Sequence, residues 1–230
     1  ECLEDVLPLR LFCDQRREQV LRYDWHPTHV VRRVKADRIH YQERKTILRE
    51  DVALTEISLV NRGTHPEVLL PLIPAAAEDQ ASLFGQTVCC VRRCSHREPI
   101  TLLPGEEVTI WAAAGFGLPD EPLEARVLGV LHPGAIDAMI EAERAFYRDT
   151  VPDFDCSDQS VKTVYAYRHY ILRRNLSRPG VGYLPHPVFY EGKQGGYSRL
   201  ITASSSLILD EARWWRDPAY GYGHMRNCIE

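Results

Sequence analysis

The chain has 230 residues, 44% of them hydrophobic and 26% charged, with a formal net charge of −4 at pH 7. This length allows one large domain or two modest ones, with a real hydrophobic core. The weakly acidic balance, with no basic tract, gives no electrostatic footprint for nucleic acid, so we expect no nucleic-acid partner. No apolar run approaches the roughly 18 residues that a membrane span requires, and we expect no membrane insertion.

The sequence contains seven cysteines, an odd number whose spacing is unlike that of a compact disulfide scaffold. This usage favours a reducing compartment, and we predict a cytoplasmic protein. Cys89, Cys90 and Cys94 lie close together in the sequence. Adjacent cysteines point to opposite faces of a strand, however, and no second ligand pair follows at zinc spacing. We therefore predict ordinary strand cysteines, no metal site and no cofactor.

Both ends of the sequence look like cuts through a longer protein. The first residues carry no initiator Met and no signal-peptide pattern, and the last residues follow directly on a helix-like segment. An export signal could therefore be missing, and its absence says little about localisation.

Residues 1–131 show the pattern of short β-strands separated by polar turns. In segment 51–63, DVALTEISLVNRG, successive side chains alternate before an Asn-Arg-Gly turn signal. In segment 99–117, a Pro-Gly-Glu turn predicts a hairpin between two strand-like runs. Several short strands of this kind predict an antiparallel β-sandwich.

A helical period replaces the strand pattern near residue 132. Apolar side chains fall near one helical face within residues 132–150, which we predict to be a linker helix. Ser157 or Asp158 can cap a second helix, which a Pro-Gly pair ends. We predict a third helix over residues 202–215. The order is therefore a β-rich domain, a linker helix and a helical hairpin.

The segment that joins the second and third helices, roughly residues 176–201, is longer than a usual helix–helix connection. Its aromatic residues argue against disorder, and its Glu and Lys supply charge. A sugar-binding cleft needs this combination, because a flat ring covers the C–H face of a sugar while charged groups bind its hydroxyls. We therefore predict that this segment is functional.

Three motifs of the last third resemble the start of the helical barrel in six-hairpin glycosidases. They are FDCSD (154–158), FYEGKQGGY (189–197) and SSSLILDEARWWRDP (204–218). This group of glycoside hydrolases is built on an (α/α)6 barrel and includes mannosylglycerate hydrolase and processing α-glucosidases. Many members carry an N-terminal β-sandwich joined to the barrel by a linker helix, which the β-rich part of this chain also resembles.

The resemblance implies a multidomain α+β protein that is the front portion of a longer enzyme. Residues 1–131 would form the β-sandwich domain and residues 132–150 the linker helix. Residues 151–230 would form the incomplete start of the glycosidase domain, with room for about one of its six hairpins. The implied reaction is glycosidic hydrolysis of a carbohydrate substrate by carboxylate acid/base catalysis with inversion. The second carboxylate is expected beyond residue 230, and this chain alone is expected to be inactive.

Two other functions remain open at this point. A non-catalytic carbohydrate-binding protein would use the β-sandwich for binding. A glycoside phosphorylase would use a related barrel for a different reaction. The sugar, its linkage and the oligomeric state do not follow from the residues.

Glu191 is the candidate catalytic residue. It follows two aromatic residues that could exclude water and precedes a glycine that permits close approach of a ligand. The alternative is a surface carboxylate paired with Lys193. The candidate substrate-binding residues carry aromatic or cationic side chains on the same segment or on the helix before it: Tyr190, Lys193, Tyr197, Arg168 and His169.

The remaining polar and aromatic clusters favour structural roles. Asp153, Asp155 and Asp158 suit a helix N-terminus, where carboxylates satisfy free N–H groups. Trp214 and Trp215 at helical spacing usually pack in a core, with sugar stacking as the alternative. The serines at 204–206 lack a nucleophile elbow and an ordered His/Asp set, so we do not expect serine chemistry.

Overall fold

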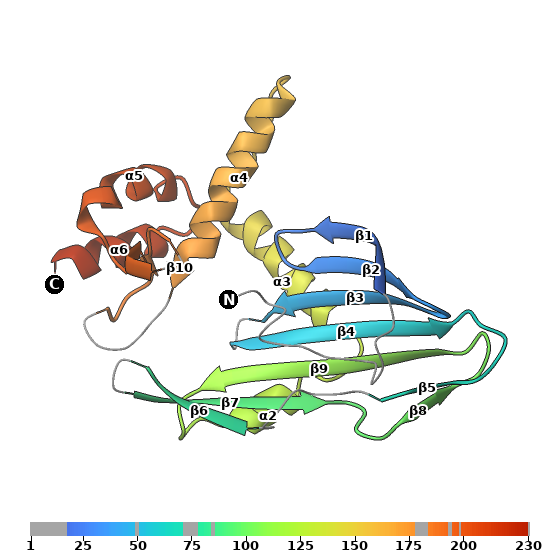
Figure 1. Ribbon diagram of the computed structural model, residues 1–230. Helices are drawn as coiled ribbons and strands as arrows, with labels where there is room; N and C mark the ends of the chain where they lie inside the picture. The colour runs from blue at the N-terminus through green and yellow to red at the C-terminus, as the bar shows by residue number, and fades with distance from the viewer. Residues whose placement is uncertain are drawn as a thin grey trace. The chain divides into compact units, whose positions relative to one another are not determined.

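The computed structural model describes residues 18–48, 51–70, 78–83, 86–177, 184–192, 195–197 and 199–229 (Figure 1). The chain divides into two compact units, Glu1–Glu141 and Ala142–Glu230. The division falls within the segment 132–150 that the sequence predicts to be a linker helix. The expected α+β class is confirmed, because a β-rich first unit is followed by a helical second unit.

The first unit contains a seven-stranded sheet in which every neighbouring pair of strands is antiparallel (Figure 1). Two short strands, β5 and β8, form a separate antiparallel sheet. In spatial order the large sheet consists of β1 (Glu18–Trp25), β2 (Val30–Ala36), β3 (Ile39–Ile47), β4 (Val52–Asn61), β9 (Glu107–Gly117), β7 (Gln86–Cys94) and β6 (Glu78–Leu83). The small sheet consists of β5 (Glu67–Leu69) and β8 (Ile100–Leu102).

One face of the large sheet packs against the small sheet. Leu69 of β5 and Leu102 of β8 share a buried cluster with Ile39, Ile57 and Ile110 of the large sheet. Successive side chains of a strand point to opposite faces, so alternate residues of each strand reach this cluster. The two layers form the antiparallel sandwich that the sequence predicts, with two strands in the second layer among the described residues.

The opposite face is covered at one end by α2 (Leu123–Leu128) and by the start of α3 (Ala135–Thr150), and Figure 1 shows α2 against β9 and β7. Leu54 of β4 is fully buried in the cluster that these helices form with the sheet. The buried Arg93 of β7 donates to Glu124 of α2 from its Nε at 3.0 Å and from its Nη2 at 2.7 Å. A two-point ion pair of this kind adds a fixed orientation to the apolar contact.

The turn within segment 99–117 forms, but its two strands do not make the hairpin that the sequence predicts. β8 pairs with β5, whereas β9 pairs with β4 and β7. The fully buried Asn61, at the end of β4, donates from Nδ2 to the carbonyls of Leu102 and His65 at 2.9 and 2.8 Å. The hairpin interpretation was wrong because contacts distant in sequence draw β8 into the second layer.

The second unit is helical and packs around an aromatic cluster centred on Trp215, which is 3% exposed. The rings of Phe146, Phe189 and Tyr220 lie 5.5, 5.4 and 5.4 Å from the Trp215 ring at steep angles. This edge-to-face geometry is the favoured one for aromatic pairs. Besides the end of α3, the unit contains α4 (Gln159–Asn175), β10 (Leu176–Ser177), β11 (Val188–Phe189), η1 (Gly195–Tyr197), α5 (Thr202–Ala212) and α6 (Ala219–Ile229).

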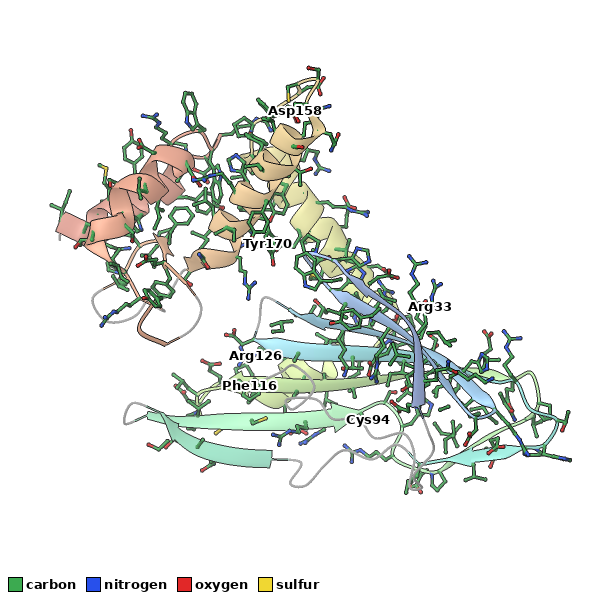
Figure 2. All side chains as sticks on the ribbon, turned by 45° about the horizontal axis from the view of Figure 1, so that its top comes forward. Arg33, Cys94, Phe116, Arg126, Asp158 and Tyr170 are labelled. Carbon is green, nitrogen blue, oxygen red and sulfur yellow. The ribbon has the colours of Figure 1, made fainter. Side chains whose placement is uncertain are left out.

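The predicted helices are present, with two differences. Asp158 caps α4 as expected, because its Oδ1 accepts from the backbone N–H groups of Ser160 and Val161 at 2.7 and 3.4 Å, and Figure 2 shows it where α4 begins. α5 ends at Ala212, three residues before the predicted end. α2 and α6 are not predicted: α2 is a single short stretch, and α6 contains two glycines, which have low helix propensity.

Candidate functional site

The described residues 184–192 between α4 and α5 are held in place by hydrogen bonds from α4 and α6. β10 and β11 pair antiparallel, and Phe189 of β11 is buried in the aromatic cluster. The backbone N–H of Tyr190 donates to the Asn175 carbonyl at 2.9 Å, and Asn175 Nδ2 donates to the Glu191 carbonyl at 3.2 Å. From α6, Asn227 Nδ2 donates to the His186 carbonyl at 3.0 Å. The backbone at Glu191 is therefore held by hydrogen bonds from both sides, and the function of this segment stays a prediction.

The candidate catalytic carboxylate stands at the edge of this anchored backbone. Glu191 is exposed, while the preceding Tyr190 is half-buried and Phe189 is buried. The N–H of Gly192 donates to the Tyr197 carbonyl at 3.0 Å, which brings the 61%-exposed Tyr197 close to Glu191 in the fold. Lys193 lies outside the described residues. The structure thus gathers Tyr190, Glu191 and Tyr197 in one short segment, and their roles toward a substrate stay predictions.

The two candidates on α4 differ sharply in their surroundings. Arg168 is exposed and forms an ion pair with Glu211 of α5. His169 is buried, and its Nδ1 accepts the indole N–H of Trp215 at 3.0 Å. Burial lowers the pKa of the His169 imidazole below its usual 6.5, so the ring is neutral near pH 7. Both side chains already have protein partners, and their substrate-binding roles stay predictions.

The two adjacent tryptophans lie in opposite environments. Trp215 packs in the core, as the sequence favours, whereas Trp214 is 63% exposed. The Arg213 guanidinium lies over the Trp214 ring at 5.2 Å and also pairs with Asp210. An exposed ring backed by a cation can stack on a sugar, so Trp214 keeps the alternative that the sequence left open.

The structure contains a buried serine–histidine pair, Ser205 and His224, that the sequence pattern does not reveal. The Nε2 of His224 and the Oγ of Ser205 lie 2.9 Å apart, and His224 Nδ1 accepts the backbone N–H of Phe189 at 3.1 Å. Because Nδ1 is an acceptor, the proton sits on Nε2, and His224 donates to Ser205 instead of activating it. Ser205 in turn donates to the Ile201 carbonyl at 3.0 Å. The pair fixes α5, α6 and β11 together and does not form a nucleophile.

The acidic cluster before α4 makes local structural contacts. Asp153 pairs with Arg216 at 2.9 Å and Asp155 with Lys162 at 2.5 Å, while Asp158 caps the helix. Within the ranges that the structure describes, no three His, Cys, Asp or Glu side chains are grouped closely enough to hold a metal ion. No helix in that part of the chain is long and apolar enough to cross a membrane.

The chain shares its fold with a solved structure described as "Putative kojibiose phosphorylase from human microbiome". The two are 11% identical, with a TM-score of 0.53 over 79% of this chain and 31% of that chain. This chain therefore spans less than a third of the length of the protein that it resembles. At this identity the likeness shows the fold alone. No protein-family model matches the sequence.

Proposed function

We propose that this chain is part of a carbohydrate-active enzyme that cleaves glycosidic bonds. The observation that carries the proposal is the likeness in fold, over 79% of the chain, to a protein described as a glycoside phosphorylase. The motifs of the last third, which resemble those of six-hairpin glycosidases, support the same class of substrate independently of that likeness.

Hydrolysis with inversion is the reaction that the sequence motifs favour. It needs two carboxyl groups about 6.5–9.5 Å apart, one to protonate the leaving oxygen and one to activate water. Glu191 is our candidate for one of them, because its backbone is fixed by Asn175 and the neighbouring rings can exclude water. We expect the second carboxyl group in a part of the enzyme that follows residue 230.

Phosphorolysis is the second candidate, and the description of the structural neighbour favours it. In this reaction inorganic phosphate attacks the anomeric carbon and the glycosidic oxygen leaves with a proton, which yields a sugar 1-phosphate and a free sugar. Phosphate is already an anion, so no enzyme base has to activate it. A single carboxylic acid such as Glu191 would then suffice for proton transfer, provided that the enzyme also binds phosphate.

A role for Glu191 as general acid, in either reaction, requires that its carboxyl group be shielded from water. A general acid works near neutral pH only if its pKa is raised by apolar surroundings or a nearby negative charge. Glu191 is exposed in this structure. We therefore propose that further parts of the enzyme, together with bound sugar, complete the wall around it.

The outer surfaces of α4 and α6 support this proposal. Val161, Val164 and Ile171 are exposed along α4, and Tyr222 and Ile229 are exposed along α6. Val161, Val164 and Ile171 follow one another at intervals of three and seven residues, and Tyr222 and Ile229 are seven residues apart, so each set lies along one face of its helix. Exposed apolar surface of this kind is typical of regions that another part of a protein covers.

To test the proposal, the protein is expressed from the complete reading frame, and its rate of cleavage of a panel of glucose disaccharides is measured. We expect Glu191→Gln to lower kcat by at least about a hundredfold, since general acid catalysis contributes roughly 10²–10⁴ in rate. Glu98→Gln is the matched control, because Glu98 is an exposed carboxylate in the other unit. Equal activity of the two variants would remove Glu191 from the chemistry, and sugar binding without turnover would favour the non-catalytic alternative.

A further inference from the structure

The half of the large sheet that α2 and α3 leave uncovered carries a shallow hollow. Its volume is about 320 Å³, at the lower end of the roughly 300–1,000 Å³ of small-molecule sites. The buried Val34, Tyr41 and Leu59 line its floor; all three belong to the apolar cluster on the opposite face, so their side chains point away from it. The floor of the hollow is therefore made largely of strand backbone. Its walls are side chains of residues that alternate along the strands with Val34, Tyr41 and Leu59.

Strand register places these wall residues in two adjacent rows. In the first row, Arg33 of β2 lies opposite Gln42 of β3, which lies opposite Ser58 of β4. In the second row, His40 of β3 lies opposite Val60 of β4, which lies opposite Glu107 of β9. All six residues line the hollow. The rows come from four strands of one rigid sheet, so their spacing is set by the fold rather than by a mobile loop.

The chemistry of the rows is mixed and close to neutral. Arg33 Nε donates to Gln42 Oε1 at 3.0 Å, which orients the guanidinium and leaves the Gln42 amide N–H groups as donors. Figure 2 shows the Arg33 side chain standing away from its strand. The Ser58 and Thr109 hydroxyls lie 3.1 Å apart. Glu107 supplies a carboxylate acceptor, so the wall offers one cation, one anion, an amide and a hydroxyl.

We propose that this hollow binds a neutral saccharide. Sugar hydroxyls both donate and accept hydrogen bonds, so they match a wall that presents donors at Arg33 and Gln42 and an acceptor at Glu107. Val60 and the exposed Leu21 provide apolar surface for the C–H groups of a sugar ring. A purely anionic ligand matches less well, since Glu107 would repel it. This site belongs to the first unit, whereas Glu191 belongs to the second.

The test is NMR titration of the ¹⁵N-labelled 230-residue chain with kojibiose and with maltose, a choice of probes that rests on the proposed function. An open site of this size predicts a Kd of about 1 mM, so the titration should extend to roughly ten times that concentration. We expect saturable shifts of the backbone amides of Gln42, Ser58 and Val60.

Gln42→Ala and Glu107→Gln should each weaken binding by about three- to tenfold, the equivalent of one lost hydrogen bond. Both positions are at least partly accessible, so the variants should fold, and the amide spectrum checks this directly. Gln159→Ala and Glu98→Gln are the matched controls on exposed positions outside the hollow, and they should bind like the unmodified chain.

Four results would overturn the proposal. The first is no saturable shift, and the second is equal affinity in the hollow variants and the controls. The third is a response to inorganic phosphate but not to the disaccharides, which would make the hollow an anion site. Shifts confined to the segment around Glu191 would also refute the hollow while leaving the proposed function intact. Conversely, binding in the hollow together with an inactive full-length protein would refute only the proposed function.

Discussion

The two glycines of α6 should respond oppositely to the same substitution. A methyl group added at Gly221 would meet nothing closer than Leu209 Cδ2 at 3.9 Å. A methyl group added at Gly223 would lie 2.8 Å from Pro187 Cδ and 2.9 Å from the Pro187 carbonyl oxygen. Replacing glycine by alanine inside a helix gains up to about 1 kcal/mol. Overpacking against a fixed backbone costs roughly 1–3 kcal/mol.

Gly221→Ala should therefore stabilise the second unit by up to about 1 kcal/mol, whereas Gly223→Ala should be neutral or destabilise it by up to about 2 kcal/mol. Both variants share the gain in helix propensity, so it largely cancels in the difference between their free energies of unfolding. That difference therefore reports the steric cost at Gly223. Hydrogen exchange of α6 amides, read by mass spectrometry, measures the free energy of opening for each variant. Equal stabilisation by both substitutions, or a larger loss at Gly221, would refute the packing of α6 on Pro187.

Three further predictions concern the buried histidines of the second unit, the N-cap of α4, and the ion pair between Arg93 and Glu124 of α2. Burial lowers the pKa of His169 and His224, so the unfolded state takes up protons first as pH falls below about 6.5. Unfolding free energy of the second unit should then decrease toward pH 5 by at most about 1.4 kcal/mol per pH unit for each ring. Urea unfolding across this range measures it, and constant or rising stability would contradict it. Asp158→Ala should cost about 1 kcal/mol and speed amide exchange in the first turn of α4, with Asp158→Asn closer to the unmodified chain. Glu124→Ala should lower the free energy of unfolding by about 1–2 kcal/mol, because it removes a carboxylate partner of the buried Arg93. Thermal unfolding measures this loss, and an unchanged melting temperature would contradict a stabilising role of this ion pair.

Local pattern was sufficient for several structural features that depend on neighbours in sequence. The alternation in segment 51–63 corresponds to β4, whose side chains divide between the two faces of the sheet. The cap at Asp158 and the apolar face of α3 follow from spacings of three and four residues. The α+β class was predictable for the same reason, since strand and helix periods occupy separate parts of the chain.

Features that depend on distant partners could not be read from the pattern. β8 does not pair with β9, the next strand in sequence. Asn61, which is 41 residues from Leu102 in sequence, donates a hydrogen bond to the Leu102 carbonyl and so ties β8 to the end of β4. α6 was missed because Gly221 and Gly223 argue against a helix locally. Close packing on Pro187 explains only Gly223, where a side chain would clash.

The candidate site stays a prediction from the sequence, and the contacts that hold its segment could not be predicted. The spacing of aromatic and charged residues led us to propose the region of Glu191, and in the structure the Glu191 carbonyl accepts a hydrogen bond from Asn175. Two of the anchors, His224 and Asn227, lie 35 and 41 residues from their partners and carry no local signal. The partner of His169 could not be predicted either. The helical period places His169 on α4, but it does not show that the indole N–H of Trp215 donates a hydrogen bond to its Nδ1.

The most direct test of the proposed function is to identify the products that the protein expressed from the complete reading frame forms from kojibiose, with and without inorganic phosphate. ³¹P NMR detects a sugar 1-phosphate, and a glucose assay detects hydrolysis in the same mixture. Cleavage of the glycosidic bond by either route is the predicted result, and dependence on phosphate would decide for phosphorolysis. Failure to cleave any disaccharide of the panel, with or without phosphate, in a protein that folds and binds sugar would contradict the proposal.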